Sequence, residues 1–295
     1  MKNYRILLFY KYVDLDEPEN LVKEHLKWCL NNNIKGRVFF AKEGVNGTVS
    51  GTIENIKKYK KHLTHFKVFN DIWFKEDEGT GHVFKKMHVR LKNEIVSSAL
   101  KNVSPNNGGK RMLPDQLKQL YDNNENFIIV DARNWYESKI GRFKNAITPQ
   151  IKNFREWKRV VDELKEHKNK TIVTYCTGGI RCEKGSAYMV EQGFTDVYQL
   201  EGGIYNYVNQ YPDTYWEGGM FVFDERRVVA VNTKDELKNI SNCYYCDKPT
   251  TYYINCHNQD CDKLFVICHK CKIEQDYCCS DECRNSPNKR NIYHG

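Results

Sequence analysis

The sequence has no long apolar segment, and this absence excludes a broad class of proteins at the outset. No run among its 295 residues approaches the roughly 20 consecutive apolar residues that a membrane-spanning helix needs. Residues 1–15 have only a short apolar run followed by a lysine, without the longer apolar stretch and small-residue cleavage site of a secretory signal. We therefore expect no membrane partner and a cytoplasmic location, where thiols stay reduced.

Two cofactor signatures are missing as well. The sequence contains neither the glycine fingerprint of dinucleotide-binding domains nor an identifiable iron-binding triad of two histidines and a carboxylate. Internal repeats are also absent. Cysteine, in contrast, is abundant: there are 12, and nine of them follow residue 242. In a reducing compartment these cysteines are candidates for metal binding and catalysis before disulfides.

The net charge of +8 is unevenly distributed along the chain. Residues 1–104 carry 19 Lys and Arg against 12 Asp and Glu, residues 105–242 carry 20 against 19, and residues 243–295 carry seven of each. The basic surplus therefore lies in the first third, which any anionic partner would meet first. A solvated basic surface without a partner is the alternative.

The first third, residues 1–104, alternates strand and helix signals. Its patterns predict strands at 4–13, 35–41, 47–51 and 71–78, helices at 17–33 and 53–63, a turn at 42–47 and a further extended piece at 82–96. This order is that of a ferredoxin-like α+β domain. Turn-forming residues at 104–114 predict a linker after it.

The middle third, residues 105–225, has the pattern of a parallel α/β domain. Compact apolar runs at 127–133 and 171–176, with a weaker run at 197–200, predict strands that are covered on both faces. Residues 153–167 predict a helix between the first two. Functional sites in such sheets gather at the carboxyl ends of the strands, which is where we expect Asp131 and Cys176.

The segment "YCTGGIRC" places Cys176 between a strand and a helix. Backbone N–H groups of the loop can surround the sulfur, the helix directs its positive end at it, and Arg181 adds a full charge. Only four residues separate Cys176 from Arg181, whereas cysteine phosphatases have five, which disfavours a phosphate ester as substrate. The six-residue segment "CTGGIR" resembles the active loop of rhodaneses, in which the cysteine carries a persulfide, so sulfur transfer is the default expectation. The loop consists of Thr177, Gly178, Gly179, Ile180 and Arg181.

Residues near this loop have predicted roles too. Cys182 is a candidate second thiol that resolves an oxidised Cys176 or relays its sulfur, and the alternative is a small residue packed beneath the loop. Asp131 and Arg133 are candidates for a charged pair that supports the loop, against the alternative of an ordinary surface ion pair. Glu183 and Lys184 are expected to cap the helix and face solvent.

The chain also resembles a known family. The cysteine loop, the segments "VDARNWYESKIGRFKNA", "GFTDVYQLEGGIYNY", "FVFDERRVV" and "AKEGVNGTVSG", and the cysteine-rich tail are similar to the bacterial rhodanese-domain tRNA uridine(34) hydroxylases. The likeness covers nearly the whole chain, although Ala132, Arg142 and Thr148 differ from the residues usual there.

The resemblance implies a rhodanese-like fold for the middle domain and oxygen-dependent 5-hydroxylation of the wobble uridine. Molecular oxygen would be the co-substrate, the tRNA anticodon region the partner, and Cys176 the catalytic cysteine. No obligate protein partner is evident. The alternatives are a rhodanese-type sulfurtransferase that carries a cysteine persulfide and a non-catalytic binding module.

The tail, residues 226–295, combines a linker with a small cysteine-rich domain. Four closely spaced cysteine pairs, two of them C-x2-C, predict a zinc-ribbon-like fold with two tetrahedral zinc ions. Alternation of narrow and wide pairs predicts crossed pairing: Cys243, Cys246, Cys268 and Cys271 on one ion, and Cys256, Cys261, Cys279 (or Cys278) and Cys283 on the other. His257 and His269 are alternative ligands. Reduced or redox-active cysteines are the rival interpretation.

Two basic stretches are candidates for RNA contacts. Lys85, Lys86, Arg90 and Lys92 lie among aromatic and apolar residues, and "KKYKKH" at 57–62 adds further lysines. Phosphates are bound by such charge, and an unpaired base stacks on an aromatic side chain. Either stretch is equally compatible with a solvated face.

Overall fold

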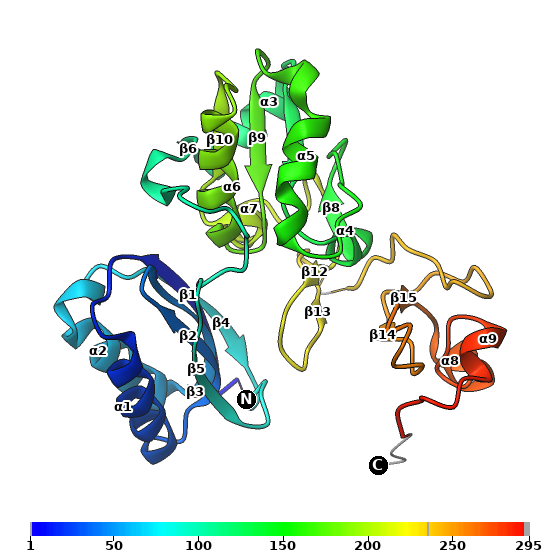
Figure 1. The fold of residues 1–295 in the computed structure, drawn as a ribbon, viewed down its shortest axis with the longest axis horizontal. Coiled ribbons are helices and arrows are strands. Elements are labelled where there is room, and N and C mark those ends of the chain that lie inside the picture. Colours follow the sequence, from blue (N-terminus) through cyan, green and yellow to red (C-terminus); the bar gives the residue numbers. More distant parts are fainter. Residues whose placement is uncertain (1, 235, 292–295) are drawn as a thin grey trace.

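The computed structural model describes residues 2–234 and 236–291 in three parts (Figure 1). The first part contains β1 (Tyr4–Tyr12), α1 (Pro18–Asn31), β2 (Lys35–Ala41), β3 (Gly44–Thr52), α2 (Ile53–His65), β4 (Phe74–Gly79) and β5 (Met87–Leu91). Its sheet has the order β4-β1-β3-β2-β5, antiparallel except for the β2–β5 pair. The predicted ferredoxin-like arrangement is confirmed, with β5 as an added edge strand.

The turn predicted at 42–47 is too long. Ala41 pairs with Gly44, so only Lys42 and Glu43 connect β2 to β3. Gly44 opens β3 with a φ of +136°, and a Cβ on this residue would meet the Lys11 carbonyl oxygen at 2.0 Å. The glycines in this stretch thus permit close strand approach and do not form a long loop.

The two faces of the first sheet are both covered. Leu7 and Phe9 of β1 pack in the core beneath α1 and α2, and these helices lie together on one side of the sheet (Figure 1). Because side chains alternate along a strand, Leu8 and Tyr10 point to the opposite face. That opposite face meets the middle domain.

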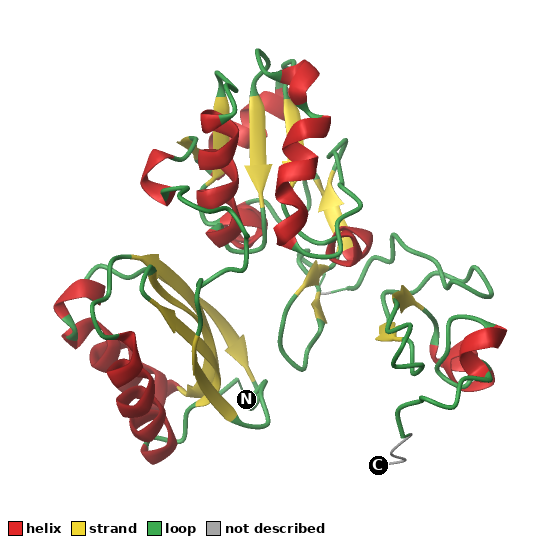
Figure 2. Cartoon of the chain, in the orientation of Figure 1, coloured by secondary structure: helices red, strands yellow, loops and turns green. Residues whose placement is uncertain are grey.

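The middle part is a parallel sheet with helices on both faces (Figure 2). It contains β6 (Lys110–Met112), α3 (Pro114–Asp122), β7 (Ile128–Asp131), α4 (Trp135–Ile140), β8 (Gly141–Phe143), α5 (Trp157–Glu163), β9 (Ile172–Tyr175), α6 (Ile180–Glu191), β10 (Val197–Leu200) and α7 (Gly203–Gln210). The strand order is β6-β10-β9-β7, all parallel. Val130 and Ile172 pack with α5 and α6, while Ile129 and Val173 pack with α3 and α7. The two-sided burial explains the continuous apolar runs.

The linker predicted at 104–114 contains a strand of this sheet. Lys110–Met112 forms β6, which pairs in parallel with Tyr198–Leu200. The strand lies at the sheet edge, and only Met112 of its three residues is buried. A three-residue edge strand with two exposed basic residues shows no apolar pattern. The turn-forming residues around it therefore led to the prediction of a linker.

The remaining elements are short. They are β11 (Trp216–Gly218), which pairs with β8, the β12 (Met220–Phe221) and β13 (Val228–Val229) pair, the β14 (Tyr253–Asn255) and β15 (Leu264–Val266) hairpin, and helices α8 (His269–Glu274) and α9 (Asp281–Arg284). Most of the tail is loop (Figure 2), and its core consists of cysteines around Phe265 and Ile267. None of the helices in the described ranges is long and apolar enough to cross a bilayer.

Candidate active site

Cys176 lies directly after β9, in the turn that leads into α6. Its side chain is 1% exposed, and the Gly179 N–H donates to its Sγ at 3.1 Å. Gly179 has a φ of +104°, a left-handed conformation that favours glycine. Since α6 begins at Ile180, the positive end of its dipole also points into this turn. The loop therefore surrounds the sulfur with donors, as a thiolate requires.

The environment of Cys176 favours the ionised form. Burial alone would raise the pKa of this thiol. The neighbouring Cys182 thiol, the Arg181 charge and the backbone N–H groups of Arg181 and Gly179 outweigh burial and lower the pKa to about 6. Burial, together with the nearby Cys176 sulfur, raises the pKa of Cys182. At neutral pH the nucleophile is therefore Cys176, and Cys182 stays protonated.

Arg181 is held by a carboxylate that the sequence patterns did not single out. Its guanidinium forms a two-point ion pair with Glu137 of α4, with N–O distances of 2.7 and 2.9 Å. Glu137 is completely buried. The pair fixes the position of Arg181 beside the loop through two parallel hydrogen bonds. The 44 residues between the partners explain why no local motif indicated the pair.

Asp131 and Arg133 form a second buried pair behind the cysteine loop. The Arg133 Nε and a terminal nitrogen donate to the two Asp131 oxygens at 2.9 and 2.6 Å. The hydroxyl of Tyr175, the residue before Cys176, donates to the same carboxylate at 2.8 Å. Both charged side chains are 0% exposed, which differs from a surface ion pair. The structure thus joins the ends of β7 and β9 beneath the loop.

Cys182 lies on the core side of the loop. It is 0% exposed and belongs to the apolar cluster that includes Trp157 and Ala187. Its backbone N–H donates to the Gly179 carbonyl at 2.9 Å, which closes the first turn of α6.

Glu183 and Lys184 do not face solvent as expected. Glu183 accepts hydrogen bonds from the Tyr10 hydroxyl at 2.9 Å and from Arg111 at 2.8 Å. The Lys184 ammonium lies 2.6 Å from Glu43 and 2.9 Å from Glu94. Both side chains are nearly fully buried because the first domain packs over the start of α6. The expectation was wrong because a helix face covered by another domain carries the same charged residues as a solvated one.

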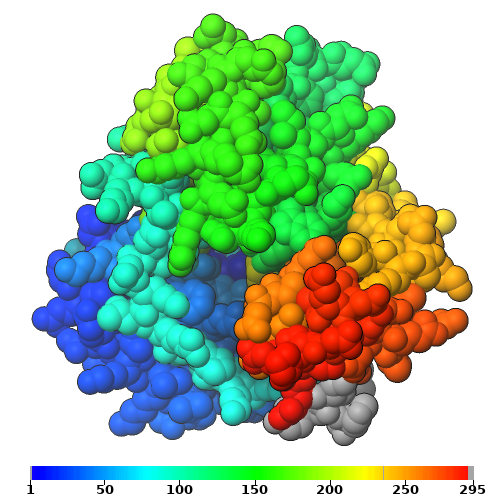
Figure 3. Space-filling view, turned by 45° about the vertical axis from the view of Figure 1, so that its right-hand side comes forward, coloured from blue at the N-terminus to red at the C-terminus, as the bar shows by residue number. Residues whose placement is uncertain are grey.

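Cys176 opens into a cavity between the two domains. The cavity has a volume of about 420 Å³, within the range of about 300–1,000 Å³ typical of small-molecule sites. The space-filling view shows a hollow where the surfaces of the first, middle and last parts of the chain meet (Figure 3). The cavity is lined by the open face of the first sheet, the cysteine loop, α7 and the hairpin of β12 and β13. The lining side chains include Leu8, Tyr10, Phe39, Lys75, Lys92, Thr177, Arg181, Tyr205 and Phe223.

The predicted RNA-contacting residues separate into two groups. Lys92 lines the cavity, with its ammonium 5.5 Å from the centre of the Phe39 ring, and Arg37 lines the same wall. Lys85, Lys86 and Arg90 are exposed but do not line the cavity. The lysines of the "KKYKKH" stretch belong to α2, on the sheet face that points away from Cys176. Among the predicted RNA-contacting residues, only Lys92 therefore lines the cavity that contains the Cys176 thiol.

Eight cysteines of the tail form two clusters of four. In each cluster the Sγ atoms lie within 4.8 Å of one another, and three close contacts measure 3.6–3.8 Å. A tetrahedral ion with metal–sulfur bonds of about 2.3 Å would place its ligands about 3.8 Å apart, so the donor sets fit zinc. The clusters consist of Cys243, Cys246, Cys268 and Cys271, and of Cys256, Cys261, Cys279 and Cys283.

The structure separates Cys279 from its neighbour. Cys278 lies outside both clusters and donates its thiol to the Cys283 carbonyl at 3.4 Å. His257 and His269 also lie outside and pack on Tyr277 and Tyr252 instead. The two clusters have the composition that the crossed spacing predicts.

Comparisons with known proteins find matches to each of the three parts of the chain. Three family descriptions match: a UPF0176 acylphosphatase-like domain over residues 4–95, a rhodanese-like domain over 113–210 and a rhodanese C-terminal region over 217–284. A Bacillus licheniformis protein named tRNA uridine(34) hydroxylase is 44% identical, covering 99% of this chain and 92% of its own. One of the same name from Cytophaga hutchinsonii is 41% identical, covering 98% and 93%. The chain belongs to the tRNA uridine(34) hydroxylase family. A rhodanese-like protein from Staphylococcus aureus is a solved structure with 28% identity over 33% of this chain and 90% of that one, at a TM-score of 0.29.

Sequence reasoning missed the residues that come from the first domain. Tyr10 and Lys75 line the site, yet neither lies near Cys176 in the sequence. One usable signal existed, because β1 reads "YRILLFYKY", with apolar or aromatic residues on both faces. A strand of an ordinary two-layer domain would be polar on its outer face, so this pattern indicates a second covering partner.

Proposed function

We propose that this chain hydroxylates uridine 34 of tRNA at C5, with Cys176 as the reacting group and molecular oxygen as the oxidant. The observation that carries the proposal is the position of Cys176, a thiol of lowered pKa that opens into the cavity between the rhodanese-like domain and the basic first domain. Membership of the tRNA uridine(34) hydroxylase family supports the choice of substrate. The wobble base is unpaired in its loop, so little stacking is lost when it enters the cavity.

A thiolate suits the chemistry of a uracil ring. When the Cys176 sulfur forms a bond to C6, the electron pair of the C5–C6 double bond moves to C5 and the adjacent carbonyl. C5 then becomes nucleophilic and adds oxygen as a hydroperoxide. Loss of the C5 proton and of the bond between sulfur and C6 restores the double bond and releases the Cys176 thiolate. The thiolate takes the outer oxygen as a sulfenic acid and leaves 5-hydroxyuridine, and the Cys182 thiol then forms a disulfide with Cys176 and releases that oxygen as water. A thiol reductant must reduce this disulfide before the next turnover. Arg181, fixed by Glu137, lines the same cavity and would stabilise the negative charge that develops.

The buried pair of Asp131 and Arg133 is proposed to position the loop. It acts through Tyr175, whose hydroxyl bonds to Asp131 and whose backbone continues directly into Cys176. Cys182 is proposed as a second thiol that would form a disulfide with an oxidised Cys176. Its burial on the core side supports reaction with Cys176 alone and not with substrate.

The basic residues are proposed to bind the anticodon region of the tRNA. Lys92 and Arg37 line the cavity, while Lys85, Lys86 and Arg90 are exposed on the same domain and can contact phosphates farther along the strand. The two cysteine clusters are proposed to hold one zinc ion each. Zinc would stabilise a tail whose apolar core is small. The cytoplasmic location and the lack of an obligate protein partner stay predictions.

The proposal is tested by nucleoside mass spectrometry of tRNA. A host that lacks its own copy of the gene is complemented with the wild-type chain, with Cys176→Ala, or with an empty vector. We expect 5-hydroxyuridine above the vector baseline only with the wild-type chain. A mutant that restores the modification fully would contradict the role of Cys176.

A thiosulfate:cyanide assay on the purified protein tests the alternative of sulfur transfer. Sulfur transfer that depends on Cys176, combined with no gain of 5-hydroxyuridine in the complemented host, would replace the proposed function with a sulfurtransferase. The same purified protein, incubated with unmodified tRNA in air and under nitrogen, tests the oxygen requirement.

A further inference from the structure

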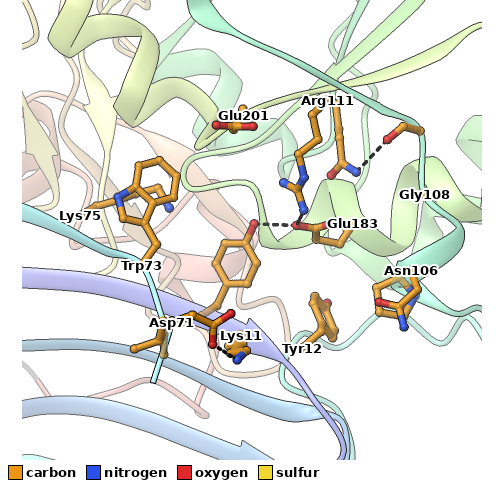
Figure 4. Close-up of a pocket in the computed structure, with 15 residues that line it drawn as sticks. Lys11, Tyr12, Asp71, Trp73, Lys75, Asn106, Gly108, Arg111, Glu183 and Glu201 are labelled. Carbon is orange, nitrogen blue, oxygen red and sulfur yellow. Dashed lines mark hydrogen bonds and ion pairs between the residues drawn. The ribbon is translucent and has the colours of Figure 1, made fainter. Parts of the chain in front are cut away.

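A second cavity lies beside the one that contains Cys176. It has a volume of about 520 Å³ and is bounded by the end of β1, the segment before β4, the loop before β6 and the start of α6 (Figure 4). Tyr10 and Lys75 line both cavities, so they form the wall between them. A ligand that passes this wall occupies both spaces at once.

Trp73 supplies an aromatic surface in this second cavity. Its side chain is 48% exposed, which is unusual for the largest apolar residue. The Lys75 ammonium lies 4.1 Å from the centre of the Trp73 ring and 5.3 Å from that of Tyr10. Exposed aromatic rings next to a cation are the surfaces on which proteins stack unpaired bases.

The charged groups of this cavity leave one donor and one acceptor free. Lys11 pairs with Asp71, and Arg111 pairs with Glu183. Among the residues that the structure describes, Lys75 and Glu201 of this cavity form no ion pair, although Lys75 is only 3% exposed. Burial lowers the pKa of Lys75 to about 8 although the charges of Cys176, Glu183 and Glu201 act against this shift. Because none of these groups forms an ion pair with Lys75, a bound anion would stabilise its charged form.

We infer that this cavity binds the nucleotide adjacent to uridine 34, with its base stacked on Trp73. The phosphodiester that joins the two nucleotides then crosses the wall at Lys75, which donates to it. Glu201 accepts from a donor on the base edge or from the ribose 2′-hydroxyl. The inference rests on the proposed function, because it places uridine 34 in the cavity at Cys176.

The test measures binding of a tRNA anticodon stem–loop RNA to the full-length protein by fluorescence anisotropy. Trp73→Ala is expected to raise Kd about tenfold or more, the usual effect of removing one stacking side chain. Trp73→Phe, which keeps an aromatic face, should recover most of the affinity. Leu30→Ala is the matched control, since Leu30 is an exposed apolar residue on α1, outside both cavities.

Two further RNAs identify the stacked base. In one the base at position 33 is removed, and in the other the base at position 35. The effect of Trp73→Ala on Kd should disappear with one of these RNAs and persist with the other. When a side chain and the base it contacts are both removed, their effects on binding free energy are not additive. Equal effects on both abasic RNAs would overturn the inference and show that Trp73 acts through the fold.

Lys75→Met tests the phosphate contact. Loss of one phosphate-binding cation should lower the slope of log Kd against log salt by about one, while thermal stability stays equal or rises because the unpaired buried charge is gone. An unchanged slope would overturn this contact.

Failure of the inference is distinguishable from failure of the proposed function. If the wild-type protein hydroxylates the stem–loop and Trp73→Ala binds it as tightly, the second cavity is not a nucleotide site and the proposed function stands. If the wild-type protein neither binds nor hydroxylates the stem–loop, both fall.

Discussion

The acidity of Cys176 should depend on one backbone position in its loop. A Cβ on Gly179 would lie 2.8 Å from the Tyr10 hydroxyl, and the residue has a φ of +104°. In Gly179→Ala the loop must shift, because an L residue is strained at this dihedral by about 1–2 kcal/mol. The shift withdraws the N–H that donates to the sulfur at 3.1 Å.

The expected change follows from that hydrogen bond. A bond to a charged group is worth about 1.5–3 kcal/mol, or about one to two pKa units. The pKa of Cys176 should therefore rise from about 6 to about 7–8. Since a more basic thiolate is also more nucleophilic, the reaction rate at high pH should rise by about three- to tenfold. Gly179→Ala is thus slower than wild type at pH 6 and faster at pH 9.

The rate of iodoacetamide alkylation, followed between pH 5 and 10, measures both the pKa of Cys176 and the reactivity of its thiolate at high pH. Trypsin cuts after Lys170 and Arg181, so the peptide 171–181 contains Cys176 without Cys182. Mass spectrometry of this peptide reports Cys176 alone among the 12 cysteines.

Gly178→Ala is the matched control for this series. Its Cβ would meet only the flexible end of Leu8 at 3.0 Å, and Gly178 has no left-handed φ. We expect the pH midpoint of Cys176 alkylation in this variant to stay within about 0.3 pH units of wild type, because the sulfur loses no strong hydrogen-bond donor. Equal shifts in both glycine variants, or a wild-type midpoint near 8.5, would refute the proposed stabilisation of the thiolate.

Two further predictions concern the tail and the first domain. Cys279→Ser should lower the zinc content of the purified protein from two ions per chain to one, whereas the adjacent Cys278→Ser should leave it unchanged; equal zinc content in the two variants would contradict the cluster assignment. His25 is buried, and burial together with His62 lowers its pKa to about 3. Because the unfolded chain binds this proton below about pH 6.5 and the folded chain does not, stability should fall by about 2 kcal/mol between pH 7.5 and 5. Urea unfolding of the wild type should show this loss of unfolding free energy between pH 7.5 and 5. In His25→Gln the slope of the unfolding free energy against pH should be smaller by the equivalent of about one proton.

The domain folds were predictable because their signals are local. The strand predicted at 35–41 matches the bounds of β2, and the apolar runs of the middle domain are β7 and β9. The cysteine loop was equally predictable, since Cys176 and Arg181 lie within one turn. Spacing likewise grouped the tail cysteines, because each pair is fixed by a few residues of chain.

The surroundings of the thiol were not predictable in the same way. Glu137 and Arg181 are 44 residues apart, and Tyr10 and Glu183 are 173 residues apart. Contacts of this kind depend on how two finished domains dock, and no helical or strand period encodes docking. For the same reason the expectation that Lys184 faces solvent was wrong. Its partners Glu43 and Glu94 belong to the first domain, far from Lys184 in the sequence.

The docking of the first domain encloses the rhodanese-like loop in a cavity. The loop supplies a thiolate, which by itself reacts with many electrophiles. The Tyr10 hydroxyl of β1 donates to Glu183 of α6, and Lys184 of α6 pairs with Glu43 and Glu94, so each domain covers polar side chains of the other. The cavity that results admits only ligands that fit between the sheet and the loop. The groups that lower the pKa of Cys176 belong to the middle domain, whereas the first domain supplies the opposite wall of the cavity.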